Sequence, residues 1–236
     1  MFAMKRALVH EPDQLLPQKR IEVKKTNLIK RHLWFFTVIN RLFFRKKSYL
    51  HSTGWTESIK RGYPCLKDGS EIPWMNYPVV TILQERLHKD LNLFEFGSGY
   101  STLFYSRLVK NVTSVEHDKK WFNFMKDKVP GNALLIHKES DINGHYCRTV
   151  SEHKGPFDIV VIDGKDRLNC MKQAIPALSE GGAIILDDSS RDKYRIAQKY
   201  ATEKGFRALQ LDGLKATNFR SCRTTILYRD NNCLNI

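Results

Sequence analysis

The sequence predicts an α/β fold, in which a mostly parallel β-sheet has helices on both faces and ends in an antiparallel last strand. From residue 91 onwards, short apolar runs rich in β-branched residues alternate with stretches of helical length. Strands that are apolar along almost their whole length belong to parallel sheets buried on both faces. The last two apolar runs have no helix between them, so they are expected to pair as antiparallel neighbours.

The individual elements follow from these runs. We expect five parallel strands at residues 91–97, 112–118, 133–139, 157–164 and 182–188. The helices expected between and after them cover about 100–110, 119–128, 167–179 and 191–204. The antiparallel pair at the end of the chain is expected at 206–212 and 222–229. With 236 residues, the chain is long enough for this domain, at 91–236, and an N-terminal extension of helices and loops.

The N-terminal extension, residues 1–60, is basic. It has 13 Lys and Arg against 4 Asp and Glu, so it supplies most of the net charge of +14. Residues 28–47 have apolar residues at roughly helical spacing with basic residues at both ends, which predicts an amphipathic helix. Such a helix suits an anionic membrane surface, and it equally suits packing on the body or on a second copy in a homodimer. Nucleic acid is less favoured, because the rest of the chain is only mildly basic.

Residues 61–90 are expected to form a lid at the mouth of the site. "KDGS" is a turn signal, and two prolines bracket Trp74 and Tyr77 in an extended loop before a helix at about 78–89. These two aromatic residues would cover a ligand or pack in the core.

The expected location is the cytoplasm, with a peripheral membrane contact through residues 28–47 as the alternative. The five cysteines are scattered without a CxxC motif, as is typical of free thiols in a reducing compartment. We find no secretory signal and no apolar run of about 18 residues, the length that a membrane-spanning helix needs.

A glycine turn, "LFEFGSGYST", follows the first predicted strand and indicates a cofactor. A triphosphate loop needs GxxxxGK[ST], which is absent. A dinucleotide fingerprint needs a third glycine, and Thr102 stands in that position, which disfavours NAD without removing it. S-adenosylmethionine has no phosphate to cradle, so two glycines suffice. The residues expected around the cofactor here are Glu95, near its amino acid end, with Gly97, Ser98, Gly99 and Thr102.

Acidic residues at the ends of the next two predicted strands indicate that the cofactor contains a nucleoside. Glu116 ends the second strand about 20 residues after the glycine turn, where a carboxylate accepts both ribose hydroxyls. NAD and S-adenosylmethionine share this ribose, so Glu116 does not choose between them. His117 lies beside it. After the third strand, Glu139 or Asp141 would meet the adenine amino group.

Three further carboxylates are expected at the same edge of the sheet. Asp163 follows the fourth strand, and Asp187 and Asp188 end the fifth. Clustered carboxylates repel unless a cation neutralises them, and Mg²⁺ prefers such oxygen ligands. The alternative is that Asp163 contacts a ligand while Asp188 caps the helix that begins near residue 191.

Taken in order, these motifs resemble the class I S-adenosylmethionine-dependent methyltransferases over about residues 72–229. "FEFGSGYST" resembles their glycine motif, "SVEHD" their ribose acid, and "FDIVVIDG" and "GGAIILDD" their fourth and fifth strands. The resemblance implies a Rossmann-like sheet and S-adenosylmethionine as cofactor. The last two motifs are also similar to the metal-dependent O-methyltransferases, which implies Mg²⁺ held by Asp163, Asp187 and Asp188.

A hydroxyl acceptor must lose a proton during methyl transfer, so we expect a base near the donor. The candidates for catalysis are Asp163, Asp188, Lys165 and His145, the last in what reads as a long polar loop over 140–150. The expected acceptor is a hydroxylated small molecule or a glycan. The alternatives are an RNA methyltransferase, suggested by the net charge, and an NAD or nucleotide-sugar enzyme of the Rossmann type.

Overall fold

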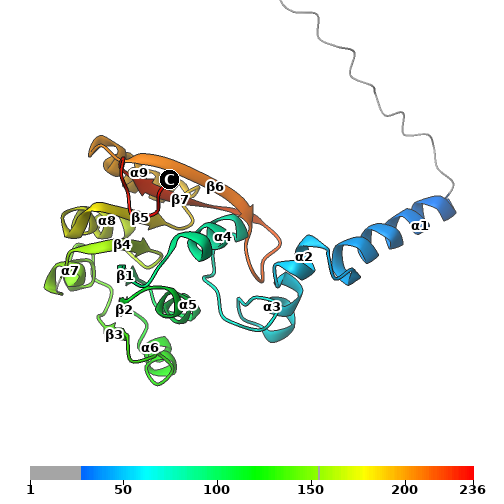
Figure 1. Ribbon diagram of the computed structural model, residues 1–236, viewed down its shortest axis with the longest axis horizontal. Coiled ribbons are helices and arrows are strands. Elements are labelled where there is room, and N and C mark those ends of the chain that lie inside the picture. Colours follow the sequence, from blue (N-terminus) through cyan, green and yellow to red (C-terminus); the bar gives the residue numbers. More distant parts are fainter. Residues whose placement is uncertain (1–27, 154) are drawn as a thin grey trace, which may run out of the picture.

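One mixed sheet organises the body of the chain (Figure 1). The computed structural model describes residues 28–153 and 155–236, so the first 27 residues of the predicted extension lie outside the described residues. Within this part, seven strands form the sheet in the order β3-β2-β1-β4-β5-β7-β6. The strands are β1 (Asn92–Phe96), β2 (Asn111–Glu116), β3 (Ala133–His137), β4 (Phe157–Ile162), β5 (Leu178–Leu186), β6 (Arg207–Leu214) and β7 (Ser221–Tyr228).

The pairing confirms the predicted fold class. Strands β1 to β5 run parallel to one another, whereas β7 pairs antiparallel with both β5 and β6. Because the carboxyl ends of β1, β2, β4 and β5 lie at one edge, the residues that follow these strands come together there.

Helices cover both faces of the sheet because successive strand residues point to opposite sides. On one face, Leu93 and Ile159 pack with α4 (Tyr77–Arg86) and α5 (Tyr100–Leu108). On the other face, Phe94 and Val160 pack with buried residues of the C-terminal helices. These helices are α7 (His145–Glu152), α8 (Arg167–Ala177) and α9 (Asp192–Glu203), while α6 (Lys119–Met125) lies beside β2 and β3.

Helix α7 corrects the loop predicted over 140–150. The helix forms because Tyr146, Cys147 and Val150 lie on one side of it and are buried against α8. The carboxylate of Asp141 accepts hydrogen bonds from the first backbone N–H groups of the helix. The helix has only eight residues, which is too short for the helical spacing of its apolar residues to be recognised in the sequence alone.

The N-terminal segment projects from the body (Figure 1). Helix α1 (Leu28–Ile39) continues into a π-helical turn (Asn40–Phe44) and is followed by α2 (Tyr49–Ser52) and α3 (Trp55–Arg61). Phe43 packs on Trp55, whose ring centroid is 5.9 Å away, and this contact joins the segment to the core. None of the described helices has the length and apolarity needed to cross a bilayer.

The segment between α3 and α4 forms the predicted turn. Cys65 and Glu71 make an isolated antiparallel bridge, and Gly69 has φ +90° in the turn that joins them. The two aromatic residues of this region have different environments. Trp74 is 52% exposed, whereas Tyr77 is buried at the start of α4.

Candidate functional site

A cavity of about 510 Å³ opens at the carboxyl edge of the parallel strands. Its walls come from the turn after β1, the ends of β2 and β4, the beginning of α9 and the segment before α4. This is where open α/β sheets bind ligands. The predicted site residues that line it are Gly97, Ser98, Gly99, Glu116, His117, Asp163 and Lys165.

The glycine turn brings the ends of β1 and β4 close together. Gly97 has φ +92°, and a Cβ there would lie only 3.0 Å from the Gly164 Cα. A Cβ on Gly164 would in turn lie 1.9 Å from the Tyr146 hydroxyl oxygen. Neither position leaves room for a side chain, and the sequence motifs do not indicate this requirement at Gly164.

Glu95 supports this turn without lining the cavity. Its carboxylate is fully buried and accepts hydrogen bonds from Ser101, from Thr102 (2.6 Å) and from Ser114 (2.8 Å). Thr102 also accepts a hydrogen bond from the N–H of Gly99 at 3.1 Å. Burial raises the pKa of Glu95 to about 7, although the three hydroxyl hydrogen bonds oppose this rise. Glu95 and Thr102, both expected around the cofactor, therefore fix the first turn of α5.

Glu116 is held rigidly at the cavity wall. One carboxylate oxygen accepts hydrogen bonds from the Ser98 N–H (3.0 Å) and hydroxyl (3.1 Å). The other accepts from the N–H groups of His117 (2.8 Å) and Asp118 (2.7 Å). Trp121 fixes the same turn, because its indole N–H donates to the Ser98 carbonyl at 2.9 Å. Of the four donors to Glu116, only the Ser98 hydroxyl can rotate away.

Besides Glu95 and Thr102, the predicted site residues Asp141, His145, Asp187 and Asp188 do not line the cavity. The carboxylate of Asp141, expected near adenine, accepts hydrogen bonds from the N–H groups of His145 (2.9 Å) and Tyr146 (3.1 Å). These bonds lower the pKa of Asp141. His145, expected as a base, is exposed at the start of α7 and does not line the cavity. Asp141 and His145 therefore form the N-terminal end of α7, where the carboxylate caps the first backbone N–H groups.

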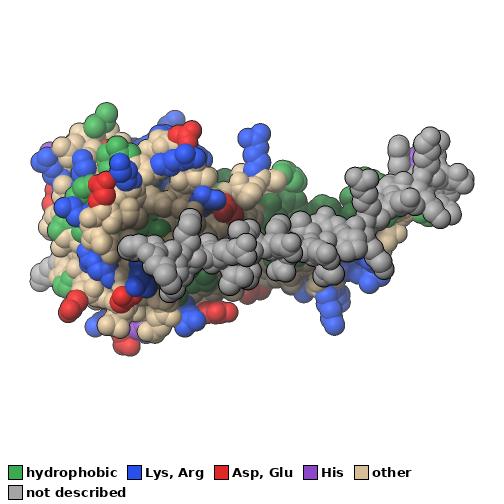
Figure 2. Space-filling model, turned by 90° about the horizontal axis from the view of Figure 1, so that it is seen from above, with side chains coloured by type: hydrophobic (Ala, Val, Ile, Leu, Met, Phe, Trp, Pro, Cys, Tyr) green, Lys and Arg blue, Asp and Glu red, His purple; other side chains and the backbone are tan. Residues whose placement is uncertain are grey.

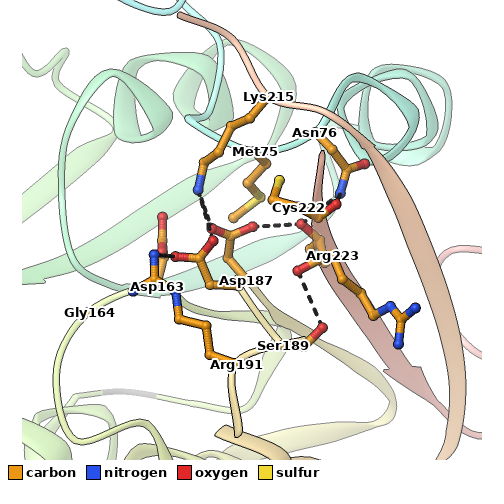
Figure 3. Close-up of polar contacts among 12 residues, drawn as sticks. Met75, Asn76, Asp163, Gly164, Asp187, Ser189, Arg191, Lys215, Cys222 and Arg223 are labelled. Atoms are coloured by element: carbon orange, nitrogen blue, oxygen red, sulfur yellow. Dashed lines mark hydrogen bonds and ion pairs between the residues drawn. The ribbon is translucent and has the colours of Figure 1, made fainter. Parts of the chain in front are cut away.

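Two of the three expected carboxylates, Asp187 and Asp188, share the ammonium group of Lys215 (Figure 3). Lys215 Nζ lies 2.8 Å from Asp187 Oδ2 and 3.3 Å from Asp188 Oδ1. The second oxygen of Asp187 accepts a hydrogen bond from Thr224 at 2.6 Å. The second oxygen of Asp188 lies 2.6 Å from Arg191 Nη2. Lys215 follows β6, so the connection between the antiparallel strands supplies the cation.

Asp163 has a cationic partner of its own. Its carboxylate lies 2.8 Å from Arg167 Nη2, and the same guanidinium also donates to the carbonyls of Gly164 and Asp187. Burial and then repulsion from Asp187 raise the pKa of Asp163, while Arg167 and Lys215 oppose the rise. Burial lowers the pKa of Lys215, but the neighbouring carboxylates outweigh this effect and raise it, so Lys215 is an ammonium ion.

These contacts do not fit the predicted Mg²⁺ site. Asp163, Asp187 and Asp188 are each already paired with a cationic side chain of the chain itself. Nowhere in residues 28–153 and 155–236 do three or more His, Cys, Asp or Glu side chains group to hold a metal ion. The neutralising cation that the sequence required is therefore supplied mainly by Lys215, and the metal expectation is not supported.

Several lining residues were not predicted. The β4–β5 end of the cavity has Arg167, Arg191 and Lys193 in addition to Lys165, and Tyr194 follows Lys193 there. Trp74, which was expected to cover a ligand or to pack in the core, also lines the cavity. Arg167 begins α8, whereas Asp163 lies before this helix, so the helical i,i+4 spacing does not predict their ion pair. No local signal points to Lys215, because its partners lie 27 and 28 residues earlier in the chain.

The fold and the site together indicate a class of enzyme. A sheet of this order with β7 reversed, a glycine turn after β1 and an acid at the end of β2 are the features of class I S-adenosylmethionine-dependent methyltransferases. Residues 94–189 match the family model of a methyltransferase domain. Residues 94–189 therefore form a methyltransferase domain, and the features of the fold and the site around it are those of the S-adenosylmethionine-dependent class.

Solved structures agree with this fold. An O-methyltransferase from Bacillus cereus in complex with SAH is 16% identical, with a TM-score of 0.51 over 86% of this chain and 100% of that chain. An rRNA methylase from Streptococcus thermophilus is 15% identical, with a TM-score of 0.50 over 66% of this chain and 99% of that chain. At these identities the likeness concerns the fold alone. None of the curated proteins gives a match to the sequence.

Proposed function

We propose that the protein transfers the methyl group of S-adenosylmethionine to a hydroxyl of a small molecule or glycan. The observation that carries this proposal is one cavity in which Glu116 stands at the β2 end and Asp163 at the β4 end. A donor whose ribose meets Glu116 would lie over the glycine turn, with its reactive end directed towards Asp163.

The donor half of the cavity suits a nucleoside. A ribose hydroxyl would replace the rotatable Ser98 hydroxyl on Glu116 without disturbing the three backbone hydrogen bonds to this carboxylate. His117 and Trp121 line the same end and offer flat surfaces for an adenine ring.

Asp163 is the proposed base. The acceptor oxygen attacks the methyl carbon, the carbon–sulfur bond breaks with its electron pair going to sulfur, and the acceptor proton passes to the Asp163 carboxylate. A raised pKa suits this role, because it brings the basicity of the carboxylate closer to working pH. Asp188 is engaged by Lys215 and Arg191, so we assign it the positioning of Arg191 at the cavity.

Transfer from S-adenosylmethionine with a tritiated methyl group tests this assignment. A panel of hydroxylated glycans and phenols, amines and RNA is offered to the wild type and to the D163N and D127N variants. Asp127 is exposed and outside the cavity, so D127N is the matched control. We expect methylation of a hydroxyl compound that D163N reduces at least tenfold while SAH binding is kept. Full transfer by D163N would exclude Asp163 as the base.

The RNA alternative has one observation in its favour, the net charge of +14. The two solved structures named above include an rRNA methylase and an O-methyltransferase, so the shared fold does not choose between acceptors. If only the RNA substrates of the panel were methylated, the proposed hydroxyl acceptor would be wrong and RNA would be the acceptor.

We further propose that the projecting N-terminal segment lies on an anionic membrane surface. Trp34 and Phe36 are each 66% exposed and Phe44 is 75% exposed, although apolar side chains are normally covered. Arg45 and Lys46 follow directly, and Figure 2 shows basic and hydrophobic side chains together along this segment. Aromatic residues beside cations suit a bilayer interface with anionic headgroups.

Flotation with phosphatidylserine vesicles tests the membrane contact. The W34S/F36S variant should lose flotation, whereas I142S should keep it, since Ile142 is an even more exposed apolar residue (89%) but belongs to the body. If the wild type does not float and instead forms a dimer that W34S/F36S disrupts, the segment is a contact between two copies and the membrane proposal is wrong.

A further inference from the structure

The cavity has a charge gradient along the edge of the sheet. The strand order β2-β1-β4-β5 places the Glu116 wall first, then the glycine turn, then Asp163 to Lys165, and finally the beginning of α9 with Lys193. Of the acids in the described residues, only Glu116 and Asp163 line the cavity, and Asp163 is paired with Arg167. The α9 end is therefore the basic end, and it is the one left free if the donor occupies the glycine turn.

Two of the four cations at this end are already neutralised. Arg167 is paired with Asp163, and Arg191 with Asp188. Among the described residues, Lys165 has no ion-pair partner. Lys193 also lacks an acidic partner in this part of the chain, and its Nζ lies over the Tyr194 ring, 4.8 Å from the ring centroid. The α9 end thus has two cations without a counter-ion.

The methyl donor would not neutralise the excess positive charge at the α9 end. S-adenosylmethionine has a sulfonium, an ammonium and a carboxylate, so its own net charge is positive. A neutral or cationic acceptor would leave an uncompensated positive field in a partly enclosed cavity, where charges interact more strongly than in water. An anionic acceptor compensates it and is steered into the cavity by the same field.

We propose that the acceptor is a small anion, bearing a phosphate, sulfate or carboxylate that Lys165 and Lys193 bind while a hydroxyl of the same molecule faces Asp163. This rests on the proposed function and names the substrate class for the same site. A lysine ammonium is a point charge on a flexible side chain, so it can bind an oxyanion without the fixed bidentate geometry that arginine requires. The cavity of about 510 Å³, walled by Trp74 and Pro64, must also hold the donor, so the space left at its basic end suits a compact molecule better than a polymer.

Calorimetric titration of inorganic pyrophosphate into the full chain, at low ionic strength and with or without saturating SAH, tests this. We expect binding that weakens at least tenfold in the K165A/K193A variant, with SAH affinity unchanged. The K110A/K172A variant removes the same charge from exposed lysines outside the cavity and should bind like the wild type.

The outcomes separate the two proposals. If SAH binds but pyrophosphate does not, or binds equally to K165A/K193A and the wild type, the anionic acceptor is wrong and the proposed function stands. If SAH does not bind, the proposed function is wrong, and the titration without SAH still tests the basic end of the cavity. If a single-stranded RNA binds much more tightly than pyrophosphate and depends on the same two lysines, the acceptor is a polyanion and the small-molecule proposal is wrong.

Discussion

Replacing Glu95 by glutamine should change how the stability of the protein depends on pH. The carboxylate is fully buried, and burial raises its pKa from the ordinary 4.5 to about 7. Between these two values the folded state keeps a proton that the unfolded chain has lost, so the free energy of unfolding falls as pH rises. Each pKa unit corresponds to about 1.4 kcal/mol, so this one group lowers wild-type stability by about 3 kcal/mol across that range.

The E95Q variant has nothing to titrate at this position, and an amide can still accept hydrogen bonds from the surrounding hydroxyls. Urea unfolding from pH 4.5 to pH 8 should therefore show the stability of E95Q, relative to the wild type, rising by about 3 kcal/mol. The matched control is E85Q, because Glu85 is exposed on α4 and its relative stability should stay flat. A flat difference for E95Q as well would refute the reasoning, since Glu95 would then titrate with an ordinary pKa in the folded protein.

Three further variants probe other parts of the site. E116A should weaken SAH binding, measured by calorimetry, roughly 10- to 100-fold, because it removes a charged hydrogen-bond acceptor from the cavity wall. G97A should lower the free energy of unfolding by about 1–3 kcal/mol in urea titrations, because Gly97 has φ +92° and a Cβ would crowd Gly164. K215M should lower it by about 3–5 kcal/mol, because Asp187 is then buried without its cation; an unchanged unfolding midpoint would contradict the role given to Lys215.

The sheet could be predicted from the sequence because its signals are local. Each parallel strand is a nearly continuous apolar run, and burial on both faces leaves little ambiguity about such runs. Helix α7 could not be predicted in this way, since its eight residues are too few to show a helical period and Asp141, which caps it, is one of several polar residues before it. This capping explains why Asp141, which was expected at the cofactor, is found at a helix end instead.

The site was predictable where spacing along the chain determines position. Gly97 and Glu116 line the cavity because strand ends of a parallel sheet share one edge. The identity of the neutralising cation was not predictable. Lys215 reaches Asp187 only because β7 returns antiparallel beside β5, so the contact depends on how distant strands pair and has no local sequence signal.

Calorimetric titration of the wild-type chain with SAH and, separately, with NAD tests the central claim most directly. We expect SAH to bind at one site per chain and NAD to give no heat of binding. Binding of NAD without binding of SAH would contradict it, and the glycine turn would then belong to a dinucleotide site.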